Sequence, residues 1–311
     1  MRRNVSILGL LQAAAVLTVL FSVLTAIDLP NHIIQLLSHF RLQYFVVSVL
    51  LFLIFAAMFH YSYAGALLLT ALLNGFFVLS WYVPLDDERG GSEKLILLHA
   101  NVLSNNDKYQ NLIDLVDAEQ PDMIFLQEVT DDWVAGLASL QKNYPFTYAE
   151  PRTGNFGIAV YSRIPFDSIK HVDSPPLNYP TIIATATVGS EKLTLISTHP
   201  TIPLGKSQFS ARNQQLESIV DLVQAATTPV VVLGDLNATV WDRHLVNVIR
   251  SSGLSSARRG FGVLPTWPTY MPIAMIPIDH AMVSEGIAVT DMTTAKSIGS
   301  DHLPLIVTLS L

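Results

Sequence analysis

The sequence has no cysteine and few charges. Because none of its 311 residues is Cys, disulfide bridges and thiolate metal sites are excluded. Charged side chains make up 14% of the chain, the net charge is −7, and no segment is rich in Lys or Arg. Residues 93–311 carry 14 Lys and Arg against 21 Asp and Glu. This balance counts against a protein that holds nucleic acid mainly by neutralising phosphates, although local neutralisation by a metal ion leaves nuclease activity open.

Charge is wholly absent from three long apolar runs near the N-terminus. They cover residues 7–27, 42–59 and 64–83, and about 20 apolar residues are enough to cross a bilayer core as a helix. We therefore predict three transmembrane helices, at about 7–27, 42–60 and 64–83, that make residues 1–83 a membrane anchor. Three such runs in succession argue against the alternative of a buried helical domain. The first run exceeds the apolar core of a cleavable signal peptide, so we expect it to be retained.

The flanking charges indicate an orientation. Arg2 and Arg3 precede the first run, and basic residues favour the cytoplasmic side of a membrane. We expect a multi-pass protein of the plasma (inner) membrane, with a cytoplasmic N-terminus and an extracytoplasmic C-terminal domain. Between the first two runs, residues 33–40 place apolar side chains at helical spacing. This stripe predicts a short amphipathic helix on the membrane surface, with His32 and His39 solvated on its other face.

The rest of the chain has the pattern of one α/β domain. Residues 84–92 form a polar linker, and residues 93–311 alternate strand-like and helical patterns. The apolar run at 123–126 predicts a strand, whereas residues 131–142 have helical periodicity. Thr130 stands before that helix as a capping residue. A segment of this length is enough for one domain with a sizeable core.

Acidic residues mark the ends of two apolar runs. Residues 230–233 lead into Asp235 and Asn237, and Asp301 and His302 precede the last apolar run of the chain. β-Branched apolar runs of this length are typical of buried strands, where polar groups cost desolvation energy unless they have a role. Two strand ends that carry Asp with Asn or His indicate a metal-assisted hydrolytic site.

Five further segments complete a recognisable pattern. They are His99-Ala100-Asn101-Val102, Gln127-Glu128, Gly157 to Ser162, Ser197-Thr198-His199 and Ile278-Asp279-His280. In this order and at these spacings, residues 95–311 resemble the endonuclease/exonuclease/phosphatase superfamily, in a membrane-anchored bacterial form. Each motif alone is weak, and their order carries the resemblance. It implies an α/β fold of the deoxyribonuclease I type, a four-layer α/β/β/α sandwich, here preceded by three transmembrane helices.

The resemblance implies a divalent metal site. Glu128 matches the family's metal-binding glutamate, Asp301 matches a second acid of the metal site, and Asn101 matches a polar partner of metal or phosphate. All three lie next to strand-like runs, where loops gather into a site. Mg²⁺ is usually held by one or two carboxylates together with water and substrate oxygens. We therefore expect Mg²⁺ as the cofactor, with Mn²⁺ as a substitute.

The resemblance also implies a catalytic set. His302 matches the histidine that acts on the attacking water, and Asp279 matches the carboxylate that orients it. Asp235 matches the catalytic aspartate, and Asn237 matches an amide that contacts the phosphate. His199 matches a histidine that hydrogen-bonds the phosphate and stabilises its developing charge. Whether Asp235 or His302 is the base stays open.

The implied activity is metal-dependent hydrolysis of phosphodiester or phosphomonoester bonds at a membrane. Sphingomyelinase-like hydrolysis of lipid head groups is the alternative. A catalytically inactive membrane scaffold is disfavoured, because inactive relatives lose metal or histidine positions that this sequence keeps. The expected partners are a phosphoester substrate, either nucleic acid or lipid head group, and the lipid bilayer, and no protein partner is implied.

Two segments are candidates for substrate binding. Asn155 follows Gly154 on the substrate side of the expected site. The apolar, proline-rich segment that carries Trp267 and Tyr270 runs directly into Asp279, so it must lie beside the site. Its aromatic side chains either stack on a base, contact lipid or pack as an ordinary surface loop.

Overall fold

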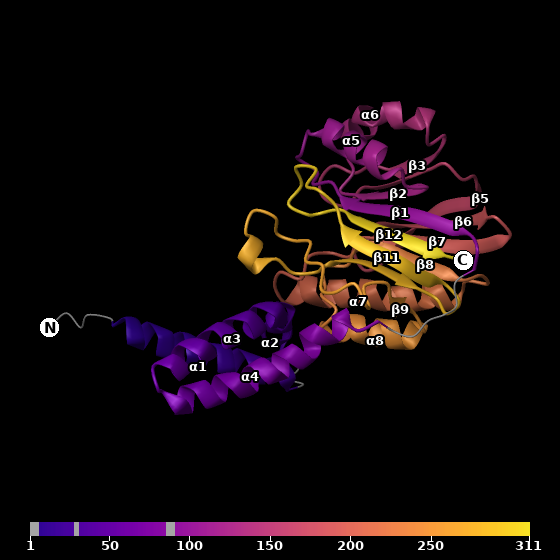
Figure 1. Ribbon diagram of the computed structural model, residues 1–311. Helices are drawn as coiled ribbons and strands as arrows, with labels where there is room; N and C mark the ends of the chain where they lie inside the picture. The colour runs from indigo at the N-terminus through magenta and orange to yellow at the C-terminus, as the bar shows by residue number, and fades with distance from the viewer. Residues whose placement is uncertain (1–5, 28–30, 85–90) are drawn as a thin grey trace. The chain divides into compact units, whose positions relative to one another are not determined.

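The chain divides into two compact units. The computed structural model describes residues 6–27, 31–84 and 91–311, and the units are Met1–Val83 and Pro84–Leu311 (Figure 1). Each unit has hydrophobic clusters of its own. Most of the predicted linker and both N-terminal arginines lie outside the described residues, so the predicted orientation stays a prediction.

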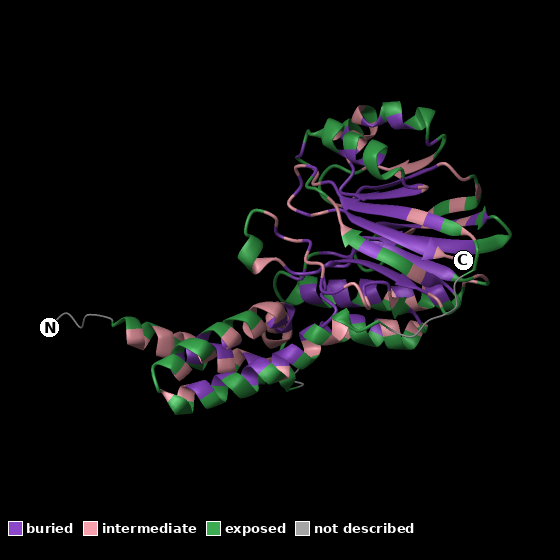
Figure 2. Cartoon of the chain, in the orientation of Figure 1, coloured by how far each residue is buried: buried purple, intermediate pink, exposed green. Residues whose placement is uncertain are grey.

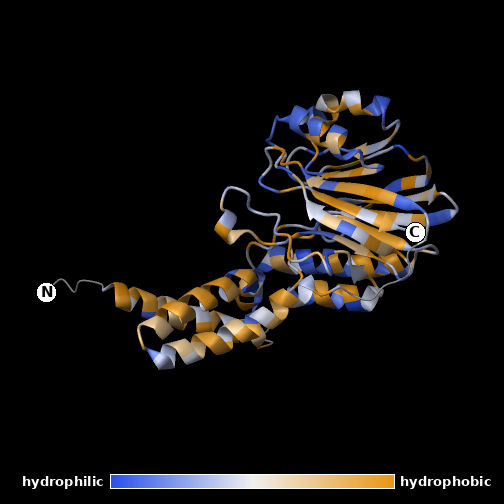
Figure 3. Cartoon of the chain, viewed as in Figure 1, coloured by the Kyte–Doolittle hydropathy of each residue, from blue (hydrophilic) through white to orange (hydrophobic). Residues whose placement is uncertain are grey.

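The N-terminal unit consists of apolar helices. Its elements are α1 (Ile7–Ala26), α2 (His32–Leu37), the 3₁₀ turn η1 (Ser38–Phe40), α3 (Arg41–Ala57), α4 (Tyr61–Leu79) and the 3₁₀ turn η2 (Ser80–Tyr82). Three helical stretches are long and apolar enough to cross a membrane, namely Ile7–Ala26, His32–Ala57 and Tyr61–Tyr82. Figure 3 shows these helices mostly in the orange of apolar residues. The three predicted helices are therefore present, as judged by length and composition.

Two predicted helices follow one another here: α2 (His32–Leu37) lies at the short helix expected near residues 33–40, and α3 (Arg41–Ala57) agrees with the apolar helix expected at about 42–60. Asn31 caps α2, because its Oδ1 accepts hydrogen bonds from two backbone N–H groups of the first turn, and η1 then leads directly into α3. The prediction of a solvated polar face is wrong at His39, which is buried. Arg41 is buried as well, and its Nη2 donates a hydrogen bond of 2.9 Å to the carbonyl oxygen of Thr25. The hydrogen bond from Arg41 connects the start of α3 to the end of α1.

The C-terminal unit contains two six-stranded mixed sheets. Their strand orders are β11-β12-β1-β2-β4-β3 and β5-β6-β7-β8-β10-β9. β1 and β2 are parallel, as are β7 and β8, and the other pairs are antiparallel. The bounds of the first sheet are β1 Lys94–Asn101, β2 Met123–Gln127, β3 Phe146–Glu150, β4 Ile158–Ser162, β11 Ala288–Thr294 and β12 Leu305–Ser310. Those of the second are β5 Phe166–Ser174, β6 Tyr179–Val188, β7 Glu191–Thr198, β8 Val230–Asp235, β9 Ser255–Ser256 and β10 Asp279–Val283.

Helices cover the outer faces of both sheets, which confirms the predicted four-layer sandwich. Side chains alternate between the two faces of a strand, so Leu95 and Leu97 of β1 enter the core between the sheets, whereas Leu98 and Ala100 pack outward. Figure 2 shows buried strands between helices with exposed outer faces. The outer helices are α5 Tyr109–Glu119 and α6 Asp131–Gly136 on the first sheet, and α7 Lys206–Gln224 and α8 Arg243–Ser252 on the second.

The helix predicted directly after β2 forms two segments instead of one. α6 ends at Gly136, and the 3₁₀ turn η3 (Ala138–Lys142) follows. Glycine has a low helix propensity, and here a Cβ would lie 2.5 Å from the Tyr109 ring, so the close packing against α5 requires Gly136. The predicted cap is confirmed, because Oγ1 of Thr130 accepts a hydrogen bond from the backbone N–H of Trp133 at 3.3 Å.

Candidate active site

Gln127 joins the two sheets at the end of the sandwich where the predicted site residues lie. From the last position of β2, its Nε2 donates to the carbonyl oxygen of Thr198 at 2.7 Å. Its Oε1 accepts the backbone N–H of Asp235 at 2.8 Å, and the side chain is fully buried. The close approach also explains Gly234, where a Cβ would lie 2.1 Å from the carbonyl oxygen of Thr198. Strand ends of both sheets are thus brought to one place.

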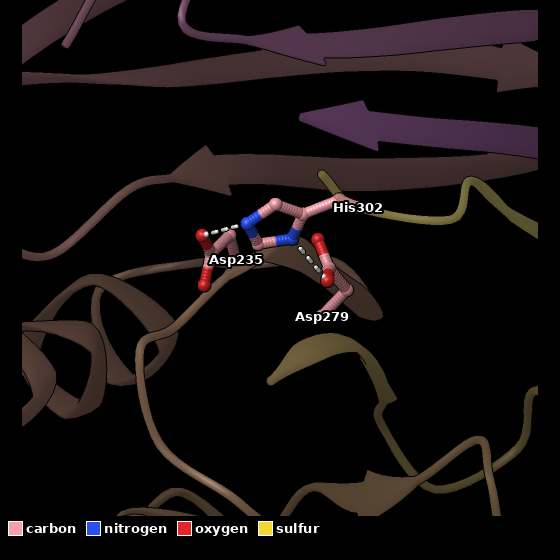
Figure 4. A group of neighbouring side chains, drawn as sticks. All are labelled: Asp235, Asp279 and His302. Carbon is pink, nitrogen blue, oxygen red and sulfur yellow. Dashed lines mark hydrogen bonds and ion pairs between the residues drawn. The ribbon is translucent and has the colours of Figure 1, made fainter. Parts of the chain in front are cut away.

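Asp279 lies between two histidines at this end. Nδ1 of His302 is 2.8 Å from Oδ2 of Asp279, and Nε2 of His99 is 2.9 Å from Oδ1. Nε2 of His302 is 3.6 Å from Oδ2 of Asp235, so the imidazole ring spans the two carboxylates (Figure 4). Asp235 pairs directly with Asp279 across β8 and β10, which explains why the two acids are neighbours.

Burial and charge shift the protonation of this group. Burial alone would lower the pKa of His302, but the charges of Asp279 and Asp235 outweigh it and raise that pKa to about 10. Burial alone would raise the pKa of Asp279, but the charge of His302 and the hydrogen bonds from both histidines hold it well below its ordinary value. The same balance, with His302 as the main opposing charge, lowers the pKa of Asp235. The protonated, cationic form of His302 is therefore favoured over the neutral form between the carboxylates of Asp279 and Asp235.

Asn101 connects two further carboxylates. Its Nδ2 donates to Oε1 of Glu128 at 3.0 Å and to Oδ2 of Asp235 at 3.2 Å, while its Oδ1 accepts the N–H of Leu103 at 3.1 Å. Oε2 of Glu128 accepts the backbone N–H of Ser104 at 3.1 Å. In this arrangement Asn101 orients the acids, since its amide oxygen is used within its own turn.

Two of the predicted site residues have left-handed backbone conformations. Glu128 has a φ of 62° and Asn237 a φ of 48°. Asn tolerates this region, because its short side chain hydrogen-bonds locally, whereas for Glu it costs on the order of 1 kcal/mol or more. Backbone strain of this kind clusters at functional sites, and the left-handed turn places the Glu128 carboxylate beside Asn101.

His199 and Asn237 flank Asp235 on its other side. Nε2 of His199 is 3.4 Å from Oδ2 of Asp235, and Nδ2 of Asn237 donates to the carbonyl oxygen of Pro200 at 3.0 Å. The backbone N–H of Asn237 donates to Oδ1 of Asp235 at 2.9 Å. Burial alone would lower the pKa of His199, but its hydrogen bond with Asp235 and the neighbouring charges raise it. Two histidines with raised pKa values therefore surround one carboxylate.

The two carboxylate oxygens of Asp301 differ in their hydrogen bonding. Its Oδ2 accepts a hydrogen bond from Nε1 of Trp267 at 2.9 Å. Its Oδ1 is buried and has no hydrogen-bond partner among the residues that the structure describes. A buried carboxylate oxygen without a partner is costly, so this atom is a candidate ligand for a cation. The ligand atoms of Asp235, Asp279 and His302 also lie within 4.8 Å of one another, but His302 and Asp279 already use theirs on each other.

A small cavity of about 150 Å³ opens at the centre of these residues. Larger cavities among the described residues lie between helices of the N-terminal unit, where the walls are apolar, and beside β9, where Ser255, Arg259 and Phe261 line a cavity of about 230 Å³; the predicted site residues line none of them. Of the ten predicted site residues, Asn101 and Asp279 lie behind the cavity wall and are almost fully buried. The other eight line the cavity: Glu128, Asn155, His199, Asp235, Asn237, Trp267, Asp301 and His302.

Sequence reasoning missed three residues near this cavity. His99 was part of a motif but received no role, although strand alternation places it on the same face as Asn101. Phe156 lines the cavity and stacks on Tyr179 with ring centres 3.5 Å apart. Arg212 received no role from the sequence; it is fully buried, and its Nη1 donates a hydrogen bond to the carbonyl oxygen of Asn237 at 3.1 Å. No local sequence signal marks the last two.

Comparisons with solved structures found proteins of similar fold. No curated protein sequence matches the chain. Among solved structures, humanized D. rerio TDP2 is 20% identical with a TM-score of 0.61, covering 71% of this chain and 100% of the other. The endonuclease/exonuclease/phosphatase of Beutenbergia cavernae is 21% identical with a TM-score of 0.58, covering 70% of this chain and 72% of the other. The human Nocturnin catalytic domain is 20% identical with a TM-score of 0.57, covering 70% and 94%.

These structural likenesses show the fold. A model of the Endonuclease/Exonuclease/phosphatase family matches residues 97–302, which is more than half of the chain and includes every residue that lines the cavity. The protein therefore belongs to the Endonuclease/Exonuclease/phosphatase family.

Proposed function

We propose that this protein is a membrane-anchored, divalent-metal-dependent phosphoesterase. The observation that carries the proposal is the convergence of buried acids and histidines on one small cavity, with an unengaged carboxylate oxygen in its wall. The family to which the chain belongs supports hydrolysis of phosphoester bonds. The three apolar helices support an anchor in a membrane.

The acids of the cavity fit a hard divalent cation. Glu128 and Asp301 both line the cavity, and carboxylate oxygens are the ligands that Mg²⁺ and Mn²⁺ prefer. We assign the metal to these two residues, with Asn101 holding Glu128 in place. Such an ion, when bound, neutralises phosphate oxygens and lowers the pKa of a bound water.

The histidines and remaining polar groups act on the phosphate. Asp279 holds Nδ1 of His302, which leaves Nε2 directed toward Asp235 and the cavity. The raised pKa of His302 supports a role as a cation that stabilises phosphate charge or donates a proton. Asp235 is then the group that accepts the proton of the attacking water. His199 and Asn237, beside Asp235, complete the phosphate site.

The substrate class is a phosphodiester or phosphomonoester. Among structures with this fold, one holds D. rerio TDP2 complexed with a single-strand DNA product, which supports a nucleic acid substrate. The acidic charge of residues 93–311 counts against strong binding of nucleic acid. Exposed apolar loops at the cavity favour a second candidate, a phosphoester at a lipid surface.

Metal dependence is the direct test of this function. The full chain in detergent should hydrolyse bis(p-nitrophenyl) phosphate, lose that activity in EDTA and regain it with Mg²⁺ or Mn²⁺. Glu128→Gln should lower kcat on the order of 10²-fold, because it removes a charged metal ligand. Glu119→Gln, on the exposed end of α5, is the matched control and should leave the rate unchanged. Full activity in EDTA contradicts the proposal.

The proposed location is the plasma membrane, with the catalytic domain on its extracytoplasmic side. Arg2 and Arg3 support this orientation by their position before the first apolar helix. Alkaline phosphatase fused after Leu311 should be active in cells, and a fluorescent protein that fails to fold outside the cytoplasm should be dark. The opposite pattern places the domain in the cytoplasm and overturns the orientation while leaving the chemistry intact.

A further inference from the structure

The loop between β9 and β10 exposes apolar side chains beside the catalytic cavity. Tyr270, Met271 and Ile273 at its tip are 71%, 48% and 87% exposed. Figure 2 shows this tip in green, projecting from the body of the sandwich. Residues 264–278 contain no charged side chain. Exposed apolar groups that cluster at one place mark an interaction surface more often than a random part of the surface does.

A second loop, between β7 and α7, adds to the same surface. Leu204 is 66% exposed, and Ile202 is 37% exposed and lines the catalytic cavity together with Trp267 of the first loop. Residues 200–205 also contain no charged side chain. The two loops therefore meet at the cavity, and we call their five exposed apolar side chains the apolar rim: Ile202, Leu204, Tyr270, Met271 and Ile273.

Hydrogen bonds fix the first loop to the catalytic residues. Nε1 of Trp267 donates to Oδ2 of Asp301, and the backbone N–H of Thr269 donates to the carbonyl oxygen of Asp301 at 2.9 Å. Oγ1 of Thr269 donates to the carbonyl oxygen of Ser300 at 3.0 Å. Trp267 also pairs with Ile276 across the base of the loop. The tip is thus held in a fixed position relative to the cavity.

We propose that the apolar rim docks on a lipid surface and that the cavity takes a phosphoester of a lipid head group at that surface. The inference rests on the proposed phosphoesterase function and names its substrate class. Tyr and apolar side chains without neighbouring charge suit the interface of a bilayer, where an aromatic ring is partly in hydrocarbon and partly in water. Docking brings phosphates of the head-group layer to the mouth of the cavity.

The apolar helices of the same chain keep the catalytic domain close to a bilayer. Only ten residues separate Val83, at the end of the third apolar helix, from Lys94, at the start of β1, which spans at most about 40 Å when fully extended. A domain on so short a tether stays at a high effective concentration near the bilayer. Nucleic acid would instead require basic residues around the cavity, and both loops of the rim lack them.

The absence of cysteine allows a direct test of docking in the full chain. Ile273→Cys and Ser190→Cys each introduce a single thiol for an environment-sensitive fluorophore. Ser190 is exposed and precedes β7, whereas the catalytic end follows that strand, so it reports on the opposite end of the sandwich. In vesicles of phosphatidylethanolamine and phosphatidylglycerol containing a nitroxide lipid, the label at 273 should be quenched and the label at 190 should not. Equal quenching at the two positions overturns the proposal.

Hydrolysis provides the second arm. Met271→Ser combined with Ile273→Ser should lower the turnover of phospholipid in vesicles on the order of tenfold, because two apolar anchors are lost. The same variant should cleave soluble bis(p-nitrophenyl) phosphate at the parent rate, because neither residue lines the cavity. Unchanged lipid turnover in the variant, or plasmid cleavage without any lipid hydrolysis in the parent, overturns the lipid assignment. A parent that cleaves no phosphodiester at all contradicts the proposed function instead.

Discussion

The hydrogen bond between His99 and Asp279 offers a test of how the site is organised. Nε2 of His99 lies 2.9 Å from Oδ1 of Asp279, and both side chains are fully buried. An ionised carboxylate only accepts hydrogen bonds, so the histidine donates. His99→Phe keeps an aromatic ring of similar size and removes the donor. Asp279 would then be held through His302 alone.

The expected cost follows from the chemistry of that contact. A hydrogen bond to a charged group contributes about 1.5–3 kcal/mol, and a buried acceptor left without its donor loses about that much. We expect His99→Phe to lower the free energy of unfolding by about 2 kcal/mol. Because Asp279 then loses one of the two histidines that hold it beside His302, kcat should fall about tenfold while KM changes little, since the loss affects the reacting geometry more than binding.

Two further variants separate positioning from general destabilisation. His99→Gln places an amide N–H near the position of Nε2 and should recover most of kcat. In the double variant that combines His99→Phe with Asp279→Asn, the loss of kcat should be no larger than in Asp279→Asn alone, because His99 acts through that carboxylate. Both are measured on bis(p-nitrophenyl) phosphate with the full chain in detergent. An unchanged kcat in His99→Phe, or fully additive losses, would refute the reasoning.

Three other predictions concern stability. In EDTA, the free energy of unfolding should fall as pH rises from about 6.5 to about 10, because the pKa of His302 is about 10 in the folded state and about 6.5 in the unfolded state. Urea denaturation across this pH range measures the effect, and the His302→Gln variant should show a flatter dependence on pH. Arg212→Met should lower the free energy of unfolding by about 3–5 kcal/mol, because it removes the buried guanidinium that pairs with the carboxylate of Asp242 at 2.9 Å; a loss below about 1 kcal/mol contradicts this. Thr130→Ala removes the cap of α6 and should lower stability by about 1 kcal/mol in thermal or urea melts, with Thr130→Ser as the neutral control.

Local features of the sequence were sufficient to predict most of the helices and strands and to identify the family. Charge-free runs predicted three long apolar helices, because the length that crosses a bilayer is a property of a single segment. Thr130 was recognised as a helix cap and residues 123–126 as a strand from neighbouring residues alone. The order of the motifs identified the family and its four-layer sandwich. The burial of His39 and Arg41 could not be predicted, because contacts with segments elsewhere in the chain, such as the hydrogen bond from Arg41 to Thr25, are not visible in the local sequence.

The contacts of the catalytic site depend on tertiary structure. His99 and Asp279 are separated by 180 positions in the chain, and Asn101 and Asp235 by 134, so only the register of strands in two packed sheets brings them together. The same packing turns one oxygen of Asp301 toward Trp267 and leaves the other unengaged. The sequence by itself determined which polar groups stand at strand ends. Tertiary structure alone decided which of them share hydrogen bonds, because those distances are set by the packing of segments that are remote in the chain.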